Sequence, residues 1–95
     1  MLGAVAELTV IDGKQAEFEV VAKELEAAVA ANEPDVLYYK LFKVAEAPTT
    51  YIFMEQYRDQ AAVDAHRGFE HFTRLGKAMG PFLAAPPKIT RMTKV

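Results

Sequence analysis

The chain has no cysteine, which excludes disulfide bonds, thiolate metal sites and a cysteine nucleophile. It also lacks an excess of charge of one sign, because 11 basic and 13 acidic residues give a formal net charge of −2. No basic stripe or polybasic run is present, so neither a nucleic acid nor a membrane surface is expected as a partner. The apolar run in MLGAVAELTV is short, has no leading Lys or Arg and meets Glu7. It predicts neither a signal peptide nor a transmembrane segment, and we expect a cytoplasmic protein.

Several catalytic signatures are missing as well. The sequence contains no Gly-rich phosphate loop, no G-x-S-x-G turn and no set of carboxylates spaced for Mg²⁺. The two histidines, His66 and His71, are five residues apart, about 140° around an ideal helix. Unless Gly68 breaks the helix sharply, they do not converge on one ion, and we expect no metal site.

Residues 1–95 are expected to form a single domain. A chain of this length has a thin core, yet 52% of its residues are hydrophobic. The surplus apolar surface needs a cover, and a second copy of the chain is the simplest one.

The order of the predicted elements indicates an α+β fold. Strand-like residues 2–11 precede a helix at 14–31, where apolar residues recur at helical spacing. Two strand-like runs at 36–44 and 49–58 are close enough to form a hairpin. A second helical region follows the capping residue Asp59, bends near Gly68 and reaches about Met79, and residues 88–95 alternate weakly as a last strand. The pattern β-α-β-β-α-β predicts a ferredoxin-like antiparallel sheet with both helices on one face.

The strands are apolar on both faces, although helices can cover only one of them. Val36, Tyr38 and Phe42 are expected to point one way, and Leu37, Tyr39 and Leu41 the other. In the next strand Tyr51 and Phe53 lie opposite Ile52 and Met54. An uncovered apolar sheet face is rare in soluble monomers. We therefore expect a homodimer in which the sheets face each other, and a large ligand or another protein is the alternative cover.

His66 and Glu55 are the residues with catalytic potential. His66 lies on the apolar stripe of the second helical region, and Glu55 interrupts an apolar, aromatic strand. An imidazole there suits proton transfer near neutral pH, and Glu55 could orient it. The alternatives are a core histidine bonded to a carboxylate or carbonyl, and a buried ion pair of Glu55 with Arg58, Arg67 or Lys40. The expected walls of an aromatic pocket are Tyr39, Tyr51, Phe53, Tyr57, Phe69 and Phe72.

Three segments of the chain resemble the antibiotic biosynthesis monooxygenase family. They are AELTVIDGKQAEF, FMEQYRDQAAVDAHRGFEHF and LAAPPKI, and the resemblance extends over essentially all residues. It implies a ferredoxin-like dimer whose sheets pack into an α+β barrel. It also implies oxidation of a small phenolic or quinol-type aromatic by O₂ without a metal or flavin cofactor. In that interpretation His66 is the base or anion stabiliser and Glu55 orients it. An isomerase using the same pair, or a non-enzymatic module that binds small aromatic compounds, is the alternative.

Overall fold

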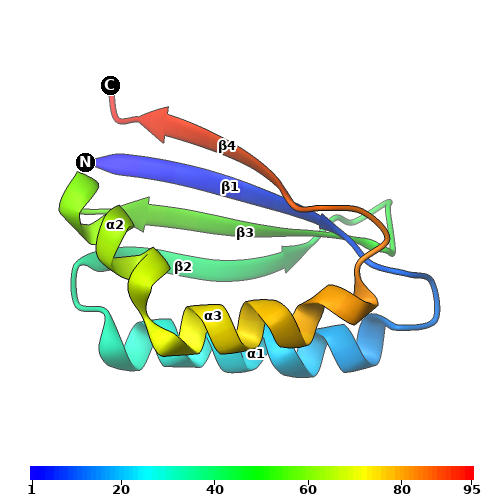
Figure 1. Cartoon of the computed structure of the whole chain (residues 1–95). Coiled ribbons are helices and arrows are strands. Elements are labelled where there is room, and N and C mark those ends of the chain that lie inside the picture. Colours follow the sequence, from blue (N-terminus) through cyan, green and yellow to red (C-terminus); the bar gives the residue numbers. More distant parts are fainter.

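The computed structural model describes all 95 residues and contains a four-stranded sheet in the order β2-β3-β1-β4. The chain forms β1 (Leu2–Thr9), α1 (Gln15–Asn32), β2 (Val36–Lys43) and β3 (Thr50–Tyr57). It continues with α2 (Gln60–Gly68), α3 (Glu70–Met79), a 3₁₀ turn (Gly80–Phe82) and β4 (Lys88–Thr93). All neighbouring strands are antiparallel, and the helices lie on one side of the sheet (Figure 1). The predicted ferredoxin-like α+β fold is confirmed. None of the helices has the length and apolar character needed to cross a membrane.

The second helical region is two helices, and the break lies where Gly68 predicted a bend. Asp59 caps α2 by accepting a hydrogen bond from the Ala62 N–H at 2.9 Å, as expected. Phe69 then takes an extended conformation with ψ of 140°, which ends α2 and starts α3 in a new direction. The junction places α3 beside α1 and leaves α2 over the ends of β2 and β3 (Figure 1).

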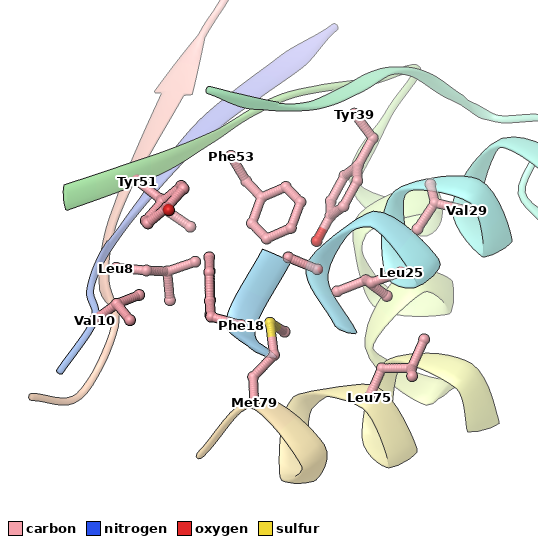
Figure 2. Close-up of a cluster of buried hydrophobic side chains, with 12 residues drawn as sticks. Leu8, Val10, Phe18, Leu25, Val29, Tyr39, Tyr51, Phe53, Leu75 and Met79 are labelled. Atoms are coloured by element: carbon pink, nitrogen blue, oxygen red, sulfur yellow. The ribbon is translucent and has the colours of Figure 1, made fainter. Parts of the chain in front are cut away.

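The hydrophobic core lies between the sheet and the layer formed by α1 and α3 (Figure 2). Phe18 of α1 is fully buried, and its ring centroid is 4.8 Å from that of Tyr51 on β3. Leu25 and Val29 of α1 continue the same buried stripe, one turn apart. These contacts fix α1 on the sheet and leave space at the α2 end of the molecule.

The other face of the sheet carries no helix. Along the β2–β3 register, Phe42 pairs with Ile52 and Lys40 with Met54, and these four side chains share the uncovered face. The predicted division of β2 is correct from Tyr38 onward and wrong before it, because a bulge between Val36 and Tyr38 shifts the register. Val36 consequently packs against the core, whereas Leu37 is exposed. Large side chains on the uncovered face are at least partly exposed: Tyr38, Phe42, Ile52, Met54 and Met92.

Replacing Phe18 by Ala should lower the free energy of unfolding by about 3 to 5 kcal/mol, because it leaves a cavity against Tyr51. Val20 lies on the same helix and is 69% exposed, so Val20→Ala should change this energy by less than about 0.5 kcal/mol. Urea denaturation at one protein concentration measures both. Similar losses for the two variants would contradict the placement of α1 on the sheet.

Candidate active site

A cavity of about 340 Å³ opens between the sheet and the helices at the α2 end. Small residues, Ala4 and Ala6 of β1 and Gly76 of α3, leave this space unfilled. Arg67, Arg91 and Gln60 are exposed side chains that contribute to the lining. Six of the eight residues singled out in the sequence line the cavity: Tyr39, Phe53, Glu55, Tyr57, His66 and Phe72.

The other two expected pocket residues lie elsewhere. Tyr51 projects from the same sheet face, but it is in the core beside Phe18, where its hydroxyl donates to Glu19 at 2.5 Å. Phe69 is the extended residue between α2 and α3, and its ring stacks on His71 with the centroids 5.0 Å apart. Neither side chain reaches the cavity.

His66 is held by a carboxylate that the sequence did not single out. Glu33 is the residue after α1, and its backbone N–H bonds to the carbonyl of Val29 at 3.0 Å. Its side chain is only 2% exposed and lies under the α2–α3 junction, where Oε1 is 2.8 Å from Nδ1 of His66. The predicted pairing of His66 with Glu55 is therefore wrong as a hydrogen bond, although both side chains line the cavity.

The two histidines converge, contrary to the helical spacing. Oε2 of Glu33 is 2.5 Å from Nε2 of His71, so each carboxylate oxygen contacts one imidazole. The break at Phe69 rotates α3 relative to α2 and buries His71, which an unbroken helix would have placed away from His66. The contacts are hydrogen bonds within a compact cluster, and no group of three or more His, Cys, Asp or Glu residues is arranged to hold a metal ion.

The Glu33 contact sets the tautomer of His66. A carboxylate only accepts hydrogen bonds, so Nδ1 of His66 carries a hydrogen and Nε2 of the neutral ring has a free lone pair. Nε2 has no hydrogen-bond partner, and no fully buried side-chain nitrogen or oxygen lacks one. Because His66 lines the cavity, Nε2 opens to it. Three aromatic rings hold the imidazole in place, with centroids 5.2 Å (Tyr39), 5.6 Å (Tyr57) and 4.5 Å (Phe72) from it.

Glu55 and two tyrosines supply the remaining polar groups of the cavity. The Tyr57 hydroxyl donates to Glu55 at 2.5 Å. Burial raises the pKa of Glu55, and the Tyr57 hydrogen bond together with the nearby charge of Arg67 partly opposes this effect. Burial and the charge of Glu55 also raise the pKa of Tyr39 and Tyr57, so both hydroxyls remain protonated hydrogen-bond donors.

Comparison with known proteins agrees with the fold described above. The sequence model of the antibiotic biosynthesis monooxygenase family matches residues 1–78. This chain belongs to that family.

Among solved structures, a protein of Caulobacter crescentus CB15 classed with the antibiotic biosynthesis monooxygenases is 39% identical, with a TM-score of 0.96 over 99% of this chain and 89% of that one. A structure described as an antibiotic biosynthesis monooxygenase is 28% identical, with a TM-score of 0.92 over 100% of this chain and 99% of that one. Rv0793 of Mycobacterium tuberculosis has the same fold at 19% identity, with a TM-score of 0.90 over 99% of this chain and 94% of that one. A search of curated proteins finds no match. For this family member, the comparisons support the monooxygenase class without naming a substrate.

The raised pKa of Glu55 predicts the pH dependence of Glu55→Gln. A carboxyl group whose pKa is raised by folding contributes stability that is fully present below its unfolded pKa and is lost as the pH rises through the folded value. The ordinary pKa of a glutamate is 4.5. The wild-type protein should therefore lose the stability contributed by the protonated Glu55 as the pH rises above that value, whereas Glu55→Gln has no such loss.

Urea denaturation at pH 7.5 should therefore find Glu55→Gln as stable as wild type or more stable, with the advantage shrinking toward pH 4. Glu46→Gln, at an exposed loop carboxylate, should show no such change. An advantage for Glu55→Gln that grows as the pH falls would contradict the raised pKa.

Proposed function

We propose that this protein is a cofactor-independent monooxygenase that oxidises a small phenolic or hydroquinone-type aromatic with O₂. The observation that carries the proposal is the environment of His66. One ring nitrogen is fixed by the buried carboxylate of Glu33, and the other opens into a cavity lined by aromatic rings. Membership of the antibiotic biosynthesis monooxygenase family supports the same class of reaction.

The cavity offers complementary contacts to such a substrate. Phe53 and Phe72 provide apolar surfaces for an aromatic ring. The Tyr39 hydroxyl has no partner within the chain and can donate to a substrate oxygen. Glu55 can accept a hydrogen bond from a second hydroxyl group while it keeps its bond to Tyr57. A ligand with a flat ring and oxygen atoms on its edge fits this arrangement.

The proposed reaction begins with proton transfer from the phenol to Nε2 of His66. The phenolate is electron-rich and passes one electron to O₂, and the radical pair recombines to form a carbon–oxygen bond. The proton from His66 goes to the outer oxygen, the O–O bond breaks, and the ring carbon loses its hydrogen as water leaves. A phenol and O₂ thus give a quinone and water, and the substrate supplies all four electrons. The protein binds the ring, holds the base and limits access of water.

We also propose that the protein acts as a homodimer formed through the uncovered sheet face. Tyr38, Phe42, Met54 and Met92 are between 39% and 45% exposed there. Several exposed apolar side chains on one sheet face are typical of an interaction site, and a two-fold axis allows one face to cover its own copy. Most of the cavity lining lies between the sheet and the helices, although Met92 contributes to both the cavity and the uncovered face.

The monooxygenase proposal predicts that O₂ is consumed when a panel of hydroquinones and phenols is supplied, in the presence of a strong chelator. His66→Ala should reduce turnover by about 10²- to 10⁴-fold, the usual effect of removing a general base. Lys77→Ala, at an exposed position on α3, should leave turnover unchanged.

An oxygen electrode and circular dichroism of both variants test this prediction. Tight binding of aromatic ligands without O₂ consumption would indicate a binding module instead. Proton exchange at substrate carbons without O₂ would indicate an isomerase.

The dimer proposal predicts a particle of about twice the chain mass in light scattering at micromolar concentration. Phe42→Glu places a charge among the apolar side chains of the uncovered face and should dissociate the dimer and lower its stability. Val20→Glu, on the outer side of α1, should leave it intact. A stable wild-type monomer would overturn the proposal.

A further inference from the structure

A row of paired residues crosses the sheet beneath the cavity and ends in an arginine. Tyr39 of β2 pairs with Glu55 of β3, Glu55 pairs with Ala4 of β1, and all three residues line the cavity. Ala4 in turn pairs with Arg91 of β4, which also lines the cavity. Paired residues of antiparallel strands share one face of the sheet, so Arg91 projects to the same side as Glu55. Two strand spacings, about 10 Å, separate their backbones, and the small side chain of Ala4 leaves the space between them open.

A second arginine reaches the cavity from α2. Gln60, Val63 and Arg67 all line the cavity and are three and four residues apart, so they share one face of this helix. Helix α2 lies at the end of the sheet where β1 begins and β4 ends (Figure 1). Arg67 and Arg91 therefore approach the same cavity from the helical side and from the sheet.

Neither of these two arginines is neutralised within the chain. No carboxylate oxygen lies within 4.0 Å of either guanidinium, whereas the other two arginines form ion pairs with exposed carboxylates. Glu55 is the only acidic residue in the cavity lining, and it bonds to the Tyr57 hydroxyl instead. The chain has a formal net charge of −2, yet its cavity presents two arginines against one carboxyl group. The cavity is therefore locally suited to an anionic ligand.

We infer that Arg67 and Arg91 bind a carboxylate group of the substrate, so that the preferred substrate is a phenol or hydroquinone with an acid group on its ring. This inference rests on the proposed function, because it uses the same cavity and the same reacting hydroxyl group. A guanidinium is a planar set of N–H donors that matches the two oxygens of a carboxylate. Arg67 and Arg91 are binding residues in this arrangement and take no part in proton transfer.

The positions of the polar groups determine the orientation of such a substrate. The hydroxyl group that loses its proton lies at Nε2 of His66, whose ring is next to Tyr39 and Tyr57. The carboxylate then points toward β4 and Arg91, away from Glu55, which would repel it whenever Glu55 is ionised. An uncharged phenol also fits, because the exposed arginines stay hydrated when no acid group is present. The arginines therefore confer a preference for acids and not an absolute requirement.

Equilibrium binding of para-hydroxybenzoate and para-hydroxybenzamide tests the inference without turnover. The two probes share the ring and the hydroxyl group, and at neutral pH only the first carries a charge. Calorimetric titration without O₂ at low ionic strength should show that the acid binds about ten-fold more tightly than the amide. The preference should shrink as salt is added, because both arginines are exposed.

Variants of the two arginines assign the preference to this site. Arg67→Gln and Arg91→Gln should each reduce it by about three-fold, and the double variant should bind both probes equally. Affinity for the amide should remain that of wild type in every variant, which shows that the cavity is intact. Arg74→Gln removes an arginine of α3 that does not line the cavity, and it should keep the full preference.

The outcomes separate this inference from the proposed function. Equal affinity of wild type for the two probes, no binding of either, or a preference that survives in the double variant would overturn the acid subsite. A preference that depends on both arginines, in a protein that consumes no O₂, would support the subsite and contradict only the monooxygenase proposal. O₂ consumption with equal kcat/KM for hydroquinone and its ring-carboxylated analogue would support the oxidation and overturn the subsite.

Discussion

The buried carboxylate of Glu33 is the interaction on which the arrangement of the site depends. It lies just after α1 and bonds to one histidine from α2 and one from α3, so it ties three helices together at a single point. This geometry is possible only because Phe69 is extended, since an unbroken helix separates residues five apart by about 140°. The break in the helix, the burial of His71 and the orientation of His66 are therefore one structural feature.

The division between core and cavity follows from side-chain size along the same surface of the sheet. Phe18 and Tyr51 fill the layer at one end, whereas β1 presents the small side chains of Ala4 and Ala6 toward the other, beneath the region where α2 diverges from α3. The resulting space holds Glu55, whose raised pKa shows that the charged form of this residue is disfavoured by its surroundings. A small protein that keeps a cavity and a half-buried acid gives up stability that filling the space would provide.

Much of the fold could be predicted from the sequence, because the period of the apolar residues identifies the elements and their order. The same pattern assigned Tyr39, Phe53 and Tyr57 to the face that lines the cavity. The pattern could not distinguish Tyr51 from these three residues. Alternation with a period of two predicts the face of the strand on which a side chain lies, but it does not predict which helix covers that position. The role of Glu33 was missed because an acidic residue directly before a proline is the usual pattern of a helix end. Its burial depends on where α2 and α3 pack, which no local pattern contains.

The two apolar faces of the sheet also connect association with the site. Tyr38 and Tyr39 are consecutive residues of β2 that point to opposite faces, as are Met54 and Glu55 of β3. In the proposed dimer, contacts on the uncovered face would immobilise the strand segments from which the cavity walls project. On the helix side, α1 packs on β2, and the Leu41 N–H donates a hydrogen bond to Glu26. The bulge before Tyr38 lies at the same end of the sheet and locally interrupts the regular pairing of β2 with β3. A partner on the far face of the proposed dimer would therefore support the strand segments that carry Tyr39 and Glu55 from the side that the helices do not cover.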